Sequence, residues 1–365
     1  MLTSLFRLYR QTSIYVLAIG YHEIWLNGLD IKGVRRYLKP NLITKKELAS
    51  TFLKGKRRGD KIFRGTVIVA SGYSALMLIL VAFAVGEGAL PIFSAEGFQF
   101  VIGTDWNAVY GRESFGALPY IIGTLLSSAI AMAIGVPISL GIAIFVTEMA
   151  SHRVSTPLSF VVELLAAVPS IIYGLWALFV FRFWVRDLIE RPLYEHLNWI
   201  PFFDKTPFGL DIFTAGIVLS IMIIPIISSI TREILLVVPN SQREAAYSLG
   251  ATRWGTLKTA IFPYAKSGIL GASFLGLGRA IGETILVTMI IGNAIGPAAI
   301  PTTLFSQGQS LASLIANEFN EAASDLHLSA LIGLGAILLL LSMIINIGAR
   351  FMVSRMVKVV PGGRE

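Results

Sequence analysis

Long apolar stretches alternate with short polar segments along this chain. Six of the stretches have about the 20 residues that a helix needs to cross the hydrocarbon core of a bilayer. These six stretches cover residues 66–85, 118–146, 158–181, 213–230, 268–291 and 328–351. The pattern predicts an all-α, polytopic membrane protein with six transmembrane helices.

The charges of the loops predict how these helices are oriented. Fourteen of the 30 Lys and Arg residues lie within the first 65 residues. The loop at 231–266 carries five basic residues and two acidic ones, whereas the loop at 292–327 carries three acids and no Lys or Arg. Because Lys and Arg are enriched in cytoplasmic loops, we expect both termini and the 231–266 loop to face the cytoplasm.

The same features divide the chain into three segments. Residues 1–65 form a basic cytoplasmic segment, which we interpret as surface helices or disorder on anionic lipid rather than a nucleic-acid-binding arm. Its apolar run at 13–20 is too short to span a bilayer and has no cleavage site of a signal peptide after it. Residues 66–356 form the transmembrane domain, and residues 357–365 form a cytoplasmic tail.

Composition supports the membrane class and excludes some chemistry. The chain is 55% hydrophobic and 14% charged, against about 25% charged in soluble domains. It has no cysteine, which excludes disulfides, cysteine metal sites and thiol catalysis. No G-x-x-x-x-G-K-[ST] motif occurs, so the chain has no phosphate-binding loop of that type for ATP. We expect no cofactor and no enzymatic activity of its own.

The loop after the fourth span, VVPNSQREAAYSLGATRWGTLKTAIFP at 237–263, predicts two short helices. Ser241 followed by Glu244 has the spacing of a capping box at a helix start. Gly250 suits a left-handed stop for that helix. A second helix is expected to begin near Thr252 and to be broken by Pro263 before the fifth span.

Charged residues within the apolar stretches are candidate site residues. Placing Arg or Glu near the bilayer centre costs about 2.5–3.5 kcal/mol on insertion scales, and the cost is usually met by pairing or by a water-filled path. Arg279 and Glu283 are spaced to share one helix face, and Glu163 of the third span is a candidate partner. The pair could be a packing salt bridge. Alternatively, Arg279 contacts an anion in transit while Glu283 and Glu163 hold its side chain.

The 237–263 loop resembles the EAA loop of ABC importer permeases, whose pattern is E-A-A-x3-G-x9-I-x-L-P. The matching residues are Glu244, Ala245, Ala246, Gly250 and Pro263. Two positions depart mildly, because Ala stands in place of the family's Ile and Phe in place of its Leu. The resemblance implies that the first helix docks on a separate ATPase subunit and transmits its motion.

Further strings narrow the resemblance. GRAIGETILVTMIIGN at 278–293 and SLASLIANEFNEA at 310–322 are similar to the C-type permease subunit of the phosphate-specific ABC importer. That family implies a multi-pass protein of the cell inner membrane. It also implies three kinds of protein partner besides lipid, and no nucleic acid. The protein partners are a paralogous A-type permease, two ATPase subunits and an extracytoplasmic phosphate-binding protein.

We therefore expect a permease subunit that moves inorganic phosphate inward, driven by ATP hydrolysis on a partner. Three alternatives stay open at this point. The substrate could be another oxyanion, such as sulfate, molybdate or tungstate. The chain could be a secondary transporter or channel that uses Arg279 and Glu283 as a proton relay, or a membrane scaffold or sensor without flux.

Overall fold

The computed structural model describes residues 45–356 and the side chains of residues 59–355. The chain divides into two units, residues 1–76 and 77–365, and each is described by itself. The expectations for residues 1–44 and for the tail at 357–365 lie outside the described residues. In the described part, five helices are long and apolar enough to cross a membrane, or six when a bent pair counts as one. This confirms the all-α, multi-span prediction.

The first predicted span lies in α2 (Lys45–Glu96), which begins in the first unit and continues into the second. The part of α2 that is apolar enough to cross a membrane runs from Gly59 to Glu96. The helix extends beyond the predicted 66–85 on both sides and passes through Pro91, and it ends at Glu96 before Gly97, whose φ is +58°.

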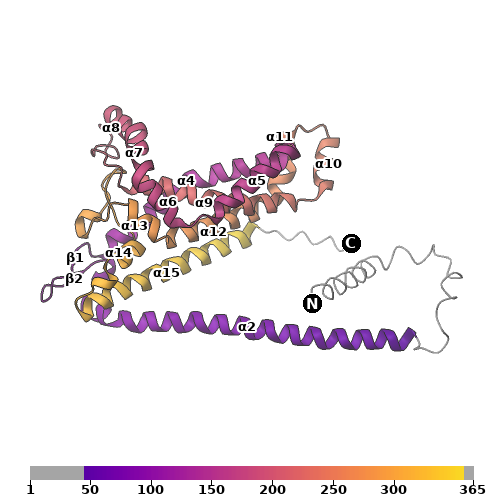
Figure 1. The fold of residues 1–365 in the computed structure, drawn as a ribbon, viewed down its shortest axis with the longest axis horizontal. Coiled ribbons are helices and arrows are strands. Elements are labelled where there is room, and N and C mark those ends of the chain that lie inside the picture. The colour runs from indigo at the N-terminus through magenta and orange to yellow at the C-terminus, as the bar shows by residue number, and fades with distance from the viewer. Residues whose placement is uncertain (1–44, 357–365) are drawn as a thin grey trace, which may run out of the picture. The chain divides into compact units, whose positions relative to one another are not determined.

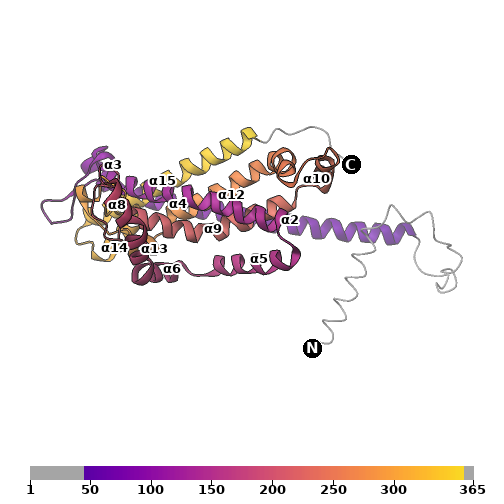
Figure 2. The ribbon, with the colours of Figure 1, turned by 90° about the horizontal axis from the view of Figure 1, so that it is seen from above.

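Four long helices of the second unit form a bundle with α9 at its centre. They are α4 (Leu118–Ile144), α9 (Ile212–Leu236), α12 (Phe262–Gly282) and α15 (Asp325–Met356). In the most apolar stretch of α9, 67% of the residues are buried, against 28–33% in the spans that contain the other three. α4 and α12 pack on α9, and α15 packs on α12 (Figure 1 and Figure 2).

Glycines allow α9 to approach its two neighbours closely. A Cβ added at Gly216 of α9 would lie 2.5 Å from Cγ2 of Ile130 on α4. A Cβ added at Gly276 of α12 would lie 2.4 Å from Cδ1 of Ile227 on α9. Without a hydrophobic driving force in lipid, such close packing is a main source of helix association.

The third predicted span is broken rather than continuous. α5 (His152–Ala167) and the helix that follows it from Ser170 to Leu197 meet at an angle of 90°. The break falls at Val168 and Pro169, where proline removes an N–H donor and restricts the preceding residue to extended backbone. The second arm consists of α6 (Ser170–Trp176), α7 (Arg182–Val185) and α8 (Arg191–Leu197), joined by π-helical turns at Ala177–Phe181 and Arg186–Glu190.

The fifth predicted span also needs correction at both ends. A continuous helical rod of 30 residues runs from Arg253 to Gly282 through α11 (Arg253–Thr256), a π-helical turn (Leu257–Ile261) and α12. Pro263 does not break it, because it follows the π-helical turn directly, where the regular hydrogen-bond pattern of the helix is already interrupted. The rod instead ends at Gly282, and the separate helix α13 (Ile285–Ile290) follows.

Short elements close the end of the bundle opposite α10 and α11 (Figure 1). They are α3 (Gln99–Ile102), the antiparallel strands β1 (Trp106–Asn107) and β2 (Ser114–Phe115), α14 (Leu311–Glu318), and 3-10 turns at Gly296–Ala299 and Phe319–Glu321. Leu311 and Leu314 of α14 are fully buried against α15 and its neighbours. Glu318 accepts a hydrogen bond from the indole N–H of Trp106 (2.8 Å) and is bonded to His327 (2.9 Å). This end is therefore fixed by apolar packing and a buried polar network.

Candidate functional site

The loop after α9 forms α10 (Asn240–Ser248) followed by α11. The predicted capping box of Ser241 and Glu244 does not form. Pro239 occupies the N-cap position and no side chain caps the helix. Because proline pre-sets a φ near −65°, the helix begins at Asn240, so Ser241 lies inside the first turn and cannot act as the cap.

The predicted turn between the two helices is confirmed. Gly250 has a φ of +80°, and the N–H of Ala251 donates to the carbonyl of Ala246 (3.1 Å), which closes α10. α11 begins where expected, since the hydroxyl of Thr252 accepts a hydrogen bond from the N–H of Gly255 (3.1 Å). The helix–turn–helix is therefore defined by a left-handed glycine and a threonine cap.

The helix–turn–helix exposes large apolar side chains on its surface. No residue of α10 is buried, and Glu244 and Ala245 are exposed. Leu249 is 89% exposed and Trp254 is 69% exposed, next to the half-exposed Tyr247. Large apolar side chains that gather on an exposed surface mark a site of protein contact.

Arg279 lies in the last turn of α12 and is exposed within this chain. It makes no hydrogen bond or ion pair with any described residue. The expected contact with Glu283 is wrong, because the helix ends at Gly282 and the backbone of Glu283 is extended (ψ 122°). The i,i+4 geometry therefore does not exist. The carboxylate of Glu283 instead accepts from the N–H of Leu286 (3.5 Å) at the start of α13.

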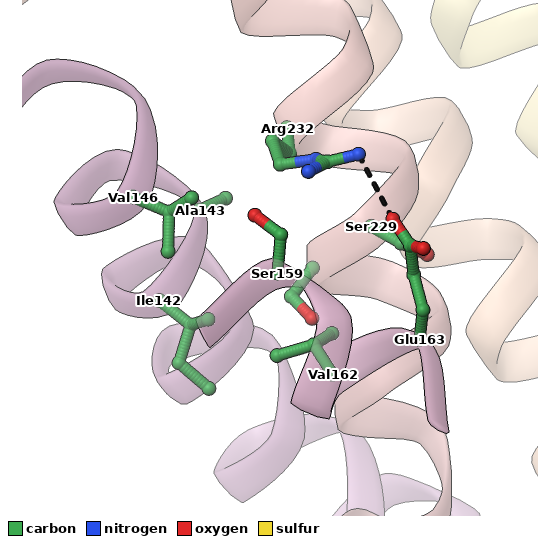
Figure 3. A pocket seen from close by; sticks show the side chains of 9 residues that line it. Ile142, Ala143, Val146, Ser159, Val162, Glu163, Ser229 and Arg232 are labelled. Atoms are coloured by element: carbon green, nitrogen blue, oxygen red, sulfur yellow. Dashed lines mark hydrogen bonds and ion pairs between the residues drawn. The ribbon is translucent and has the colours of Figure 1, made fainter. Parts of the chain in front are cut away.

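Glu163 does not contact Arg279 either, which corrects the second expected pairing. Its carboxylate accepts from Arg232 at the end of α9 (3.1 Å; Figure 3). Arg232 also pairs with Glu233 (2.8 Å). Beside this pair is a cavity of about 10 Å³, roughly enough for one water molecule. The pair joins α5 to α9. The signal that could have identified this pair is the positive charge of Arg232 close to the end of an apolar run.

A buried pair of carboxyl groups was also missed by the sequence analysis. Asp211 caps α9 by accepting from the N–H of Thr214 (2.8 Å), and the hydroxyl of Thr214 donates to Glu190 (2.6 Å). Both acids are fully buried, and each is hydrogen-bonded to Thr214. Burial raises the pKa of Asp211 above its ordinary value, although hydrogen bonds to the carboxylate oppose the shift. An Asp directly before an apolar run is a helix-start signal that could have placed it.

The comparison with protein families decides the class. The family described as "Binding-protein-dependent transport system inner membrane component" matches residues 135–358, which contain both the helix–turn–helix and Arg279. The chain belongs to this family. It is therefore a multi-pass inner membrane component of an ABC-type importer.

Individual relatives of this inner membrane component agree with the family. The phosphate transport system permease protein PstC of Pasteurella multocida is 44% identical over 303 residues, which are 82% of this chain and 93% of that protein. The protein of the same name from Haemophilus influenzae is 42% identical over 301 residues, or 81% of this chain and 94% of that protein. A solved bacterial alginate ABC transporter covers 82% of this chain and 98% of its own at 17% identity, with a TM-score of 0.49.

Proposed function

We propose that the chain is the permease subunit of an ATP-driven importer of inorganic phosphate. Support comes from relatives named as phosphate transport permeases, which match more than four fifths of the chain. The observation that carries the mechanism is Arg279, whose guanidinium is exposed and unpaired among the described residues at a break in a membrane-spanning helix.

Arg279 has the properties of a transient oxyanion site. A guanidinium presents a planar fork of donors that matches two oxygens of a phosphate. Among the side chains that the structure describes no carboxylate pairs with it, so it is available to a solute. We assign Glu283 to the pathway as the residue that fixes the start of α13 beside Arg279. Glu163, whose partner is Arg232, is proposed to hold α5 against α9 next to that pathway.

The helix–turn–helix is proposed to receive the motion of an ATPase subunit. Glu244, Ala245, Ala246 and Gly250 lie on its exposed side or at its turn, next to the apolar surface already described. Pro263 lies at the start of α12, within the rod that leads from this loop toward Arg279. The chain has no phosphate-binding loop of its own, so separate ATPase subunits supply the energy.

The rest of the assembly follows from this assignment. Both termini, the basic segment 1–65 and the α10–α11 end are proposed to face the cytoplasm. The opposite end, closed by β1, β2 and α14, is proposed to meet an extracytoplasmic phosphate-binding protein. A paralogous A-type permease is proposed to complete the translocation pathway, of which the domain at 66–356 forms half.

Substitution of Arg279 tests this function. In proteoliposomes that contain the whole importer, Arg279→Gln is expected to abolish ATP-dependent phosphate uptake while the subunits still co-purify. Arg279→Lys should retain part of the uptake, because it keeps the charge without the fork. Arg350→Gln, an exposed arginine on α15, is the matched control and should transport normally.

The outcomes also separate the alternatives. Unchanged uptake by Arg279→Gln would remove the anion-site role. Competition by sulfate, molybdate or tungstate at concentrations similar to that of phosphate would favour another oxyanion as the substrate. Uptake that persists without ATP and collapses with an uncoupler would favour a secondary transporter.

A further inference from the structure

Arg243 is the one charged side chain of α10 that turns back toward the bundle. Its neighbours Glu244 and Ala245 are exposed, whereas the side chain of Arg243 is only 17% exposed. Its bonding partner Glu148 is only 15% exposed. Among the ion pairs of Arg in the described side chains, this is the most enclosed, and the others have at least one partner that is 42% exposed or more. Enclosure reduces screening by water, so this pair is stronger than an ordinary surface pair.

The guanidinium of Arg243 joins three elements at once. Nη2 donates to Oε1 of Glu148 (2.8 Å), which lies in the π-helical turn (Phe145–Met149) that ends α4. Nη2 also donates to the carbonyl of Leu235 (2.9 Å), and Nη1 donates to the carbonyl of Val238. Leu235 lies in the last turn of α9, and Val238 lies just beyond its end, where carbonyls lack the regular partners of a helix interior.

These contacts attach α10 to the bundle at a second point. α10 is joined to α9 through the backbone at Pro239, and a single joint of this kind would let α10 swing. Arg243, four residues further on, attaches α10 a second time to the same end of α9 and also to α4. Two attachments prevent the swing. A displacement of α10 must then move the ends of α4 and α9 with it.

We propose that Arg243, with Glu148, is the positioning residue that transmits the movement of α10 to α4 and α9. This inference rests on the proposed function, in which α10 receives the movement of an ATPase subunit. Arginine is required because one planar group with five donors must serve a carboxylate and two carbonyls together. Lysine has a point charge and cannot satisfy all three in this geometry.

The test measures phosphate uptake and ATP hydrolysis in the same proteoliposomes, with the complete importer and its binding protein. For Arg243→Gln we expect normal co-purification of the ATPase subunits and continued ATP hydrolysis. The ratio of phosphate transported to ATP hydrolysed should fall about ten-fold or more, because charge-assisted bonds to three acceptors are lost. Arg243→Lys should recover part of the ratio, and Glu148→Gln should lower it less than Arg243→Gln.

Two controls make the result specific. Arg350→Gln changes an exposed arginine outside the helix–turn–helix and should leave the ratio unchanged. The double variant Arg243→Gln with Glu148→Gln should be no worse than Arg243→Gln alone, since the two residues act through one contact. Independent, additive losses would overturn the inference.

Other outcomes would also overturn it. A normal ratio in Arg243→Gln would show that movement reaches the membrane by another route. Loss of assembly in Arg243→Gln and Glu148→Gln, with no change of ratio in the complexes that do form, would show a merely structural role. Failure of the proposed function is distinguishable, because the unaltered protein would then show no ATP-dependent uptake at all.

Discussion

Substitution of Gly250, at the α10–α11 turn, separates the energetic cost of the backbone conformation from the cost of steric clash. Its φ of +80° lies in the left-handed region, and no atom lies within 4 Å of the position that a Cβ would take. Any cost of a side chain here is therefore conformational. A left-handed backbone costs an L-residue about 1–2 kcal/mol, and Asn is several-fold enriched there. If the ATPase subunit binds the native turn, Gly250→Ala should weaken the association about 5–30-fold.

The assay is a titration of purified ATPase subunits against the detergent-purified permease pair. Gly250→Asn should retain most of the affinity, because Asn tolerates the left-handed conformation. Gly255→Ala is the matched control, since this glycine of the same loop is helical and an added Cβ would make ordinary contacts at 3.4–3.5 Å. Equal losses in Gly250→Ala and Gly250→Asn, or no loss in either, would refute the conformational reasoning.

Three other substitutions test separate parts of the structure. Thr252→Ala removes the cap of α11 and should lower the stability of that helix by about 1 kcal/mol, measured by hydrogen exchange, whereas Thr252→Ser should not. Glu163→Gln should change the KM of uptake by less than about two-fold, because its half-exposed pair with Arg232 is worth about 1 kcal/mol or less. A larger change would indicate that Glu163 contributes to the anion site. Because the pKa of Asp211 is raised in the native state, that state binds more protons than the unfolded state above about pH 4. The free energy of unfolding should therefore fall as the pH rises through the raised pKa. Asp211→Asn keeps the cap and should flatten this decline in the melting temperature, and parallel curves would contradict it.

The all-helical, multi-span architecture was predictable from the sequence, although the third span is broken and the fifth begins and ends earlier than expected. A bilayer imposes a minimum apolar length, and this requirement depends on composition along the chain rather than on distant contacts. The turn of the helix–turn–helix was predictable for a similar reason. Gly250 and Thr252 act on their own backbone neighbours, so their effect can be derived from the local sequence.

The pairing of charges could not be predicted in the same way. Arg279 and Glu283 have helical spacing, but the helix ends between them at Gly282, and glycine spacing does not reveal where a rod stops. From the sequence alone, either of two arginines, Arg279 or Arg232, could have been the partner of Glu163. The packing of α5 against α9 determines that Arg232 is its partner. Such contacts depend on the tertiary path of broken helices.

The 30-residue rod from Arg253 to Gly282 connects the two halves of the proposed mechanism. At about 1.5 Å per residue it is about 45 Å long, and it begins one residue after the Thr252 cap. Arg279 lies in its last turn. A movement of the helix–turn–helix therefore reaches the rod through the chain itself, whereas on our inference it reaches α9 through Arg243.

The two routes end on helices that touch near the proposed anion site. Gly276 packs against Ile227 of α9 about one turn before Arg279, and the contact is too close for a Cβ. If the helix–turn–helix shifts the start of the rod and the end of α9 by different amounts, we expect the two helices to pivot about this contact, which is closer than the one between Gly268 and Ile234. A pivot so near to Arg279 changes the angle of the last turn of α12 more than its position. On the proposed mechanism, this rotation is what exposes the guanidinium first to one side of the membrane and then to the other.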